Sequence, residues 1–239
     1  MGRYLKIISW IVGAFLLVFL IQYPIQKSQE SWDTWSLPLS GKVIVLDPGH
    51  GGVDGGAVGK DNTLEKDIVL KIAKDLQNYL QQSGALVYLT REEDKDLADE
   101  GTDGLARRKV EDIRRRVEFI KDKEADFFVS LHLNALPSTR WNGAQTFYYP
   151  GLEDSENLAK FIQAEIKRNL ENTKRQALAL NGMYILKNAD SPGALVEMGF
   201  LSNKHERELL KTEKYQHKMA GSIYEGILRF VTEKSTNEG

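Results

Sequence analysis

The sequence predicts a single α/β domain with a mixed, mostly parallel β-sheet flanked by helices, preceded by an N-terminal transmembrane segment. Strand-like and helix-like segments alternate along the chain from about residue 41 onward. The length of 239 residues and the 41% hydrophobic content are enough for one sizeable core but not for two. An uncharged, apolar stretch lies close to the N-terminus.

That first element extends from Lys6 to Lys27 without a charged residue. An apolar helix of about 20 residues spans the roughly 30 Å of a bilayer's hydrocarbon core. Arg3 and Lys6 precede it, so the positive-inside rule sends the rest of the chain outward. No A-x-A-like pattern follows, which favours an uncleaved signal anchor over residues 1–27. The alternative is a signal peptide with a poor cleavage site, which would give a secreted domain.

A linker is predicted next, over residues 28–40, because "SQESWDTWSLPLS" has neither helical nor strand periodicity and contains Pro38. The folded domain is predicted over residues 41–232. A short disordered tail is predicted over residues 233–239.

Within the domain, short β-branched or apolar runs predict strands, and apolar residues spaced four apart predict amphipathic helices. The first helix is expected to stop before Gly84, which suits a C-terminal cap. Strands are expected at 43–46, 86–90, 126–133, 145–149, 183–186 and 194–197. Helices are expected around 68–80, 110–120, 158–166 and 219–230.

Composition excludes several kinds of function. A net charge of -2 offers no general attraction to nucleic acid, so no nucleic-acid partner is expected. The chain has no cysteine, which excludes disulfides, thiolate nucleophiles and cysteine-based zinc sites. The basic segment "RRKVEDIRRR" is interrupted by Glu111 and Asp112, so a solvated helix face is a better interpretation than a polyanion-binding face.

The glycine-rich stretch "VIVLDPGHGGVDGGAVGK" follows the first strand and is no phosphate-binding loop. A P-loop needs glycine where Asp54 lies and a hydroxyl residue where Asp61 lies. A dinucleotide fingerprint starting at Gly49 fails at Asp54 as well. Both carboxylates would repel phosphate.

A metal site is the better interpretation of this stretch. His50 follows one strand and His132 lies near the end of another, and sites in α/β proteins form beyond the carboxyl ends of strands. Imidazole and carboxylate are ligands that zinc accepts, and a catalytic zinc commonly has three protein ligands. The candidates for the third ligand are Asp54, Asp61, Glu65 and Asp67.

Each residue also has a structural alternative. Glu65 lies three residues after Asn62, as in a capping box. His132 could be a satisfied core histidine, since its strand is otherwise apolar. His205 and His217 fall on charged helical segments and are interpreted as surface residues.

A further carboxylate follows the apolar strand segment 194–196. Glu197 could take a proton from a metal-activated water and pass it to a leaving amine, as a general base and then a general acid. The alternative is an ion pair with an arginine.

Four ordered motifs carry a resemblance. "VIVLDPGHGG", the following Glu65, "VSLHLNA" and "ALVEMGFLSN" resemble the zinc-dependent N-acetylmuramoyl-L-alanine amidases of the Amidase_3 type, over about residues 41–231. The resemblance implies a mixed sheet flanked by helices, a Zn²⁺ ion held by His50, Glu65 and His132, and Glu197 as the catalytic residue.

The segments "TWSLPLSGK", "SGALVYLTRE" and "ARRKVEDIRRRV" are similar to the short, membrane-anchored spore-cortex amidases within that family. This implies cleavage of the bond between muramic acid and L-alanine in peptidoglycan before muramic δ-lactam formation, on the outer side of a forespore or spore membrane. The sequence shows no wall-binding module, so targeting depends on the anchor or on a partner such as an accessory activator protein. The rival functions are a catalytically silent peptidoglycan-binding protein and a zinc peptidase acting within the stem peptide.

Overall fold

The structure is a computed structural model that describes all residues except 1, 3, 5, 6, 9, 21–36, 238 and 239. Two compact units are distinguished, Met1–Leu37 and Pro38–Gly239. In the first unit, residues 10–20 are helical, and within the described residues no helix combines the length and apolar character that a membrane span needs. Much of the predicted anchor and most of the predicted linker lie outside the described residues.

The second unit contains a six-stranded sheet with the order β2-β1-β3-β6-β4-β5. Strands β2, β1, β3 and β6 are parallel, β4 runs antiparallel to β6, and β5 is parallel to β4. This confirms the expected mixed, mostly parallel sheet. The strands are β1 (Val43–Pro48), β2 (Leu86–Leu89), β3 (Phe127–Asn134), β4 (Gln145–Tyr148), β5 (Leu178–Ala179) and β6 (Gly193–Phe200).

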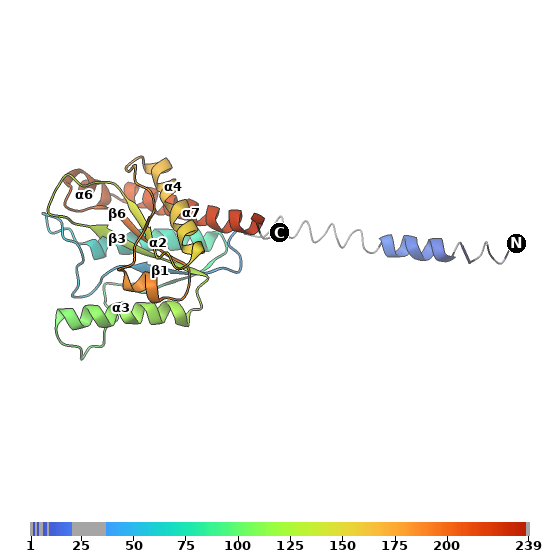
Figure 1. The fold of residues 1–239 in the computed structure, drawn as a ribbon, viewed down its shortest axis with the longest axis horizontal. Helices are drawn as coiled ribbons and strands as arrows, with labels where there is room; N and C mark the ends of the chain where they lie inside the picture. The colour runs from blue at the N-terminus through green and yellow to red at the C-terminus, as the bar shows by residue number, and fades with distance from the viewer. Residues whose placement is uncertain (1, 3, 5–6, 9, 21–36, 238–239) are drawn as a thin grey trace. The chain divides into compact units, whose positions relative to one another are not determined.

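Helices cover both faces of the sheet unequally. Three long helices, α2, α4 and α7, pack together over one face, while α3 and the short α5 cover the other (Figure 1). The larger hydrophobic core lies under the three long helices, and the smaller one lies under α3 and α5. The helices are α2 (Glu65–Gln82), α3 (Leu105–Asp122), α4 (Glu153–Leu170), α5 (Tyr184–Asn188), α6 (Lys204–Leu210) and α7 (Glu213–Asn237).

The alternation of side chains along the strands decides which face carries polar groups. In β3, Leu131 and Leu133 belong to the larger core, whereas Phe128 belongs to the smaller one. Successive side chains of a strand point to opposite faces, so Ser130 and His132 share the face of Phe128. The polar positions of this strand therefore lie on the thinly covered α3/α5 face.

Strand register aligns further polar groups on that face. In the parallel pairs, Asp47 lies beside Ser130 and Glu197 lies beside His132. Side chains that are partners across adjacent strands point to the same side of the sheet. Four polar side chains from three strands are thus gathered at the carboxyl ends of the central parallel strands.

Three features differ from the sequence-based expectation. The strand expected at 183–186 is wrong: Tyr184–Asn188 forms helix α5, and the strand in this region is the short β5. Apolar runs this short do not distinguish a strand from one turn of buried helix. Helix α7 continues to Asn237, into the tail expected to be disordered, and Leu39 is fully buried in the larger core.

Candidate metal centre

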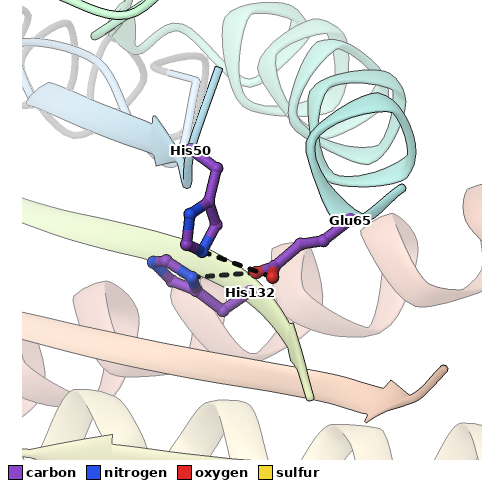
Figure 2. Close-up of side chains that lie close together, drawn as sticks. All are labelled: His50, Glu65 and His132. Carbon is purple, nitrogen blue, oxygen red and sulfur yellow. Dashed lines mark hydrogen bonds and ion pairs between the residues drawn. The ribbon is translucent and has the colours of Figure 1, made fainter. Parts of the chain in front are cut away.

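Three side chains that are distant in the sequence meet beyond the carboxyl ends of β1 and β3. They are His50 from the loop after β1, Glu65 at the start of α2, and His132 in β3 (Figure 2). His50 Nε2 lies 3.3 Å from one Glu65 carboxylate oxygen, and His132 Nδ1 lies 3.0 Å from the other. One donor atom from each residue lies within 4.8 Å of the others, so the group could hold a metal ion.

The loop that carries His50 passes very close to His132. His50 itself has a φ of 60°, an uncommon left-handed conformation for a residue with a side chain. A Cβ atom at Gly49 would lie 2.2 Å from the His132 ring, so a residue with a side chain cannot occupy this position. The glycine therefore permits the two imidazoles to approach, with ring centroids 5.1 Å apart.

Glu65 is not the capping residue that its spacing from Asn62 suggested. The N-cap of α2 is Leu64, which makes no side-chain capping bond. The Glu65 carboxylate instead accepts hydrogen bonds from the backbone N–H groups of Ala57, at 2.6 Å, and Leu133, at 2.9 Å. Burial raises its pKa, but hydrogen bonds and charge interactions with the two histidines outweigh burial and hold the pKa well below its usual range.

Hydrogen bonds on the far side of each imidazole fix the positions of the ring protons. His50 Nδ1 lies 2.8 Å from an Asp54 carboxylate oxygen, which can only accept. His132 Nε2 lies 3.1 Å from the Ser130 hydroxyl, which donates its own hydrogen to Asp47 at 2.6 Å. When the rings are neutral, both far nitrogens therefore carry the hydrogen, and the lone pairs of His50 Nε2 and His132 Nδ1 lie on the side of Glu65, where a metal ion could bind them.

Such an arrangement of lone pairs and a carboxylate needs positive charge between the groups. With only protein groups around it, burial lowers the pKa of His50, yet Glu65 and Asp54 raise it to about 9, so the ring holds an extra proton at neutral pH. A divalent cation would supply the same charge to all three groups at once. Hydrogen bonds from side chains and from the backbone already hold the three groups in place, and the donor set suits zinc.

The buried carboxylate of Asp47 supports the position of His132 through Ser130. It accepts hydrogen bonds from Thr90, Arg116 and Ser130 at 2.6 to 2.7 Å. Burial raises the pKa of Asp47, but Arg116 and the two hydroxyls lower it to about 2. Asp47 therefore stays ionised and orients Ser130, which orients His132.

Glu197 lies next to His132 across the β3–β6 pair. Its Oε2 atom is inaccessible to solvent and has no hydrogen-bond partner, although the side chain as a whole is half-buried. Within the part of the chain that the structure describes, the alternative, an ion pair with an arginine, is not formed. Burial raises the pKa of this carboxyl to about 7, against opposing effects of His132 and His50.

A pH-dependent change in stability is expected for Glu197→Gln in the metal-free protein. The raised pKa means that folding loses stability as pH rises from about 4.5, where the unfolded carboxyl titrates, to about 7, where the folded one does. Because glutamine does not titrate, the variant should gain about 1–3 kcal/mol relative to wild type between pH 5 and pH 8.

Thermal unfolding of both proteins in chelator, at pH 5 and at pH 8, measures this difference. A gain of several degrees in Tm that is present at pH 8 and small at pH 5 is expected. An equal effect at both pH values would contradict an unstable buried carboxylate.

A cavity of about 160 Å³ adjoins the two histidines on the α3/α5 face. Its apolar wall is formed by Ile113, Met183 and Ile185, and its polar wall includes Asp54 and Lys109. The sequence did not indicate the contribution of α5, because that segment was expected to be a strand. A separate hollow of about 570 Å³ beside β2 contains none of the three donors and not Glu197.

The other candidate residues lie outside the metal group. Asp61 forms ion pairs with Arg207 and Lys211, at 3.0 and 2.9 Å. Asp67 is exposed, and His217 pairs with Asp75.

The sequence analysis did not identify Arg116 or Ser130 as residues of the site, for different reasons. Arg116 belongs to the segment interpreted as a solvated face, but it is only 2% exposed and pairs with Asp47 and Asp112. No periodicity signal identifies a buried arginine within a charged helix. Ser130, by contrast, lies two residues before His132, and strand alternation alone places both on one face.

Comparisons with known proteins agree with this geometry. A family model described as N-acetylmuramoyl-L-alanine amidase, Amidase_3, matches residues 44–229. The germination-specific N-acetylmuramoyl-L-alanine amidase of Bacillus subtilis is 54% identical over 234 residues, which is 98% of each chain. The amidase LytC of the same organism is 33% identical over 195 residues, covering 81% of this chain and 36% of LytC.

Solved structures show the same likeness. The CwlD amidase of Clostridioides difficile, determined in complex with the GerS lipoprotein, matches with a TM-score of 0.79 and 42% identity. The match covers 81% of this chain and all of that one. These findings confirm the resemblance that the four motifs suggested. The chain therefore belongs to the Amidase_3 family of N-acetylmuramoyl-L-alanine amidases.

Proposed function

We propose that this protein is a zinc-dependent amidase that cleaves the bond between the lactyl group of N-acetylmuramic acid and L-alanine in spore peptidoglycan, with His50, Glu65 and His132 as zinc ligands and Glu197 as the catalytic residue. The observation that carries the proposal is the convergence of these three donors within 4.8 Å. Two imidazoles and one carboxylate match the ligand sets of catalytic zinc sites.

Zinc bound at these residues would act as a Lewis acid on the scissile carbonyl and lower the pKa of a water ligand toward about 7. The protein's contribution is to hold the ligands in the correct tautomers through Asp54 and Ser130. The left-handed turn at His50 and the N–H groups that bind Glu65 fix the remaining geometry.

Glu197 acts first as the general base and then as the general acid of the reaction. Its carboxylate accepts a proton from the attacking water as the carbon–oxygen bond forms, and the protonated carboxyl then donates it to the alanine nitrogen as the carbon–nitrogen bond breaks. The products are a lactyl carboxylate and a free amine on the peptide. Burial already raises the pKa of this carboxyl to about 7 in the metal-free protein, and a group that both accepts and donates a proton works best with a pKa close to the operating pH.

The biological setting is proposed from the similarity to two known proteins. The 54% identical relative is named germination-specific, and the CwlD amidase of C. difficile was determined in complex with the GerS lipoprotein. We therefore place this amidase in spore cortex maturation, before muramic δ-lactam formation, with an accessory lipoprotein or activator as a partner.

Localisation is proposed from the N-terminal sequence. Basic residues precede an uncharged stretch up to Lys27, which supports anchoring by residues 1–27 and an extracytoplasmic catalytic domain. Fractionation of cells expressing the full chain, followed by alkaline washing of the membranes, tests this assignment. Recovery of the protein in the wash or the medium would contradict an uncleaved anchor.

The reaction is tested with the full chain in detergent and purified peptidoglycan, with and without a chelator. We expect new amino groups on L-alanine and released stem peptides only when the metal is present, as detected by mass spectrometry. Readdition of zinc after removal of the chelator should restore cleavage.

The same experiment separates the rival functions. Cuts between residues of the stem would identify a peptidase. Binding to peptidoglycan without cleavage, with or without an added lipoprotein partner, would identify a catalytically silent binder. The unpartnered Glu197 oxygen argues against the binder, since a binding protein gains nothing from a destabilised buried carboxylate.

A further inference from the structure

The loop that carries His50 needs outside support. His50 has a φ of 60°, and such strained backbone persists only where the surroundings determine it. The carbonyl oxygens of Pro48, Gly49 and His50 all accept hydrogen bonds from arginine side chains. Two arginines, Arg91 and Arg116, supply every one of these bonds.

Arg91 follows β2 and is only 1% exposed. Its guanidinium donates to four backbone carbonyls: from Nε to Pro48 at 3.0 Å, from Nη1 to Glu93 at 3.1 Å, and from Nη2 to Gly49 at 3.0 Å and Lys66 at 2.8 Å. None of these hydrogen bonds goes to a carboxylate. Burial and the neighbouring Arg116 lower the pKa of Arg91 to about 10, so its charge is held at a cost in stability.

The placement of the Nη2 atom indicates what this buried charge does. Gly49 directly precedes His50, and Lys66 directly follows Glu65. A single nitrogen of Arg91 therefore joins the backbone beside one metal donor to the backbone beside another. Those two donors, His50 Nε2 and Glu65 Oε2, lie 3.3 Å apart.

Arg116 makes a different contribution. It donates to Pro48 and His50 at 2.9 and 2.7 Å, but it also pairs with Asp47 and Asp112, each at 2.7 to 2.8 Å. Its charge is compensated, and it holds the loop against α3. Among the described residues, its side chain makes no hydrogen bond to α2, so it does not set the spacing between the loop and Glu65.

We propose that Arg91 is a positioning residue that sets the separation of His50 and Glu65 and thereby raises the affinity of the site for zinc. It does so by bridging the Gly49 and Lys66 carbonyls with one planar, rigid group. The inference rests on the proposed zinc function of this site, but it concerns metal affinity and not turnover.

Arg91→Lys should weaken zinc binding about 10- to 100-fold, the range found when groups that orient metal ligands are removed. An ammonium donates from one point and cannot reach four carbonyls in the geometry of a planar fork. It keeps the positive charge, so the change tests geometry and not charge.

The experiment measures the Kd for zinc of the full chain in detergent, by competition with a chromogenic chelator, well below the melting temperature. Circular dichroism establishes that each variant is folded. The matched control is Arg207→Lys, because Arg207 is also buried and donates to a backbone carbonyl, that of Leu201, which adjoins no metal donor. We expect the control to change the Kd by less than about threefold, from the small effects typical of sites away from a metal.

Arg91→Gln, which keeps two donors and removes the buried charge, serves if the lysine variant does not fold. A folded Arg91 variant with the wild-type Kd would overturn the inference, as would failure of both variants to fold, since Arg91 would then be a determinant of folding. Absence of zinc binding by the wild type would overturn it too. Wild-type protein that binds zinc but cleaves no peptidoglycan would refute only the proposed reaction.

Discussion

Glu197→Gln is expected to lower amide hydrolysis by about 10³-fold or more while zinc stays bound at about one ion per chain. Glutamine has nearly the same shape as glutamate, but it can neither accept a proton from water nor donate one to the leaving nitrogen. Glu197 lies in register with His132 but is not one of the three grouped donors. Its loss should therefore remove chemistry without removing the metal.

Two measurements check this expectation together: the initial rate of release of L-alanyl peptides, and zinc content by atomic emission. Glu156→Gln, which changes a partly exposed carboxylate paired with Lys160 on α4, is the control and should keep wild-type activity. Loss of zinc from the Glu197 variant would show that this residue is a ligand. Retention of near wild-type rates would remove it from the proton-transfer pathway.

His132→Ala is expected to weaken zinc binding about 100-fold and to abolish cleavage. Structural zinc sites with four ligands bind with about 10–16 kcal/mol, so one ligand is worth roughly 3 kcal/mol, or about a 100-fold loss of affinity. The Glu65 carboxylate also loses its 3.0 Å contact with His132 Nδ1, and with it one of the two histidines that hold its pKa low. The remaining His50 and Glu65 cannot form a three-ligand site.

Zinc titration and the peptidoglycan assay measure the outcome. His217→Ala is the matched control, because His217 is largely exposed and pairs with Asp75 away from the three donors. The control should bind zinc and cleave as the wild type does. A His132 variant that still binds about one zinc ion with unchanged affinity would sink the proposed ligand set.

Most helices and strands were predictable from the sequence, because the spacing of apolar residues differs between the two kinds of element. The spacing of Ile68, Ile72, Leu76 and Leu80 predicts α2, and all four side chains are buried in the structure. The β-branched run at the start of β1 predicts a buried strand, which the structure confirms. Helix α5 was wrongly predicted to be a strand, because one turn of helix and a short strand bury apolar residues equally well.

The chemistry was predictable in kind. Histidines and acids placed just beyond strand ends indicated a metal site, and four ordered motifs indicated the family. The choice of Glu65 over its neighbours came from the resemblance, because Asp54, Asp61 and Asp67 were equal candidates by spacing. In the structure, Asp54 orients His50 and Asp61 pairs with Lys211, so neighbours of the same chemical type have different tasks.

The sequence by itself determined most of the secondary structure, the family and the residue types that could bind a metal, because these follow from local periodicity and from ordered motifs. Only the tertiary structure decided how the site is held. Arg116 belongs to a segment interpreted as a solvated face and Arg91 has charged residues directly after it in the sequence, yet both are buried against the carbonyls of the His50 loop. Burial of an arginine depends on which carbonyls and carboxylates the fold brings to it from distant parts of the chain, and no local pattern contains that information.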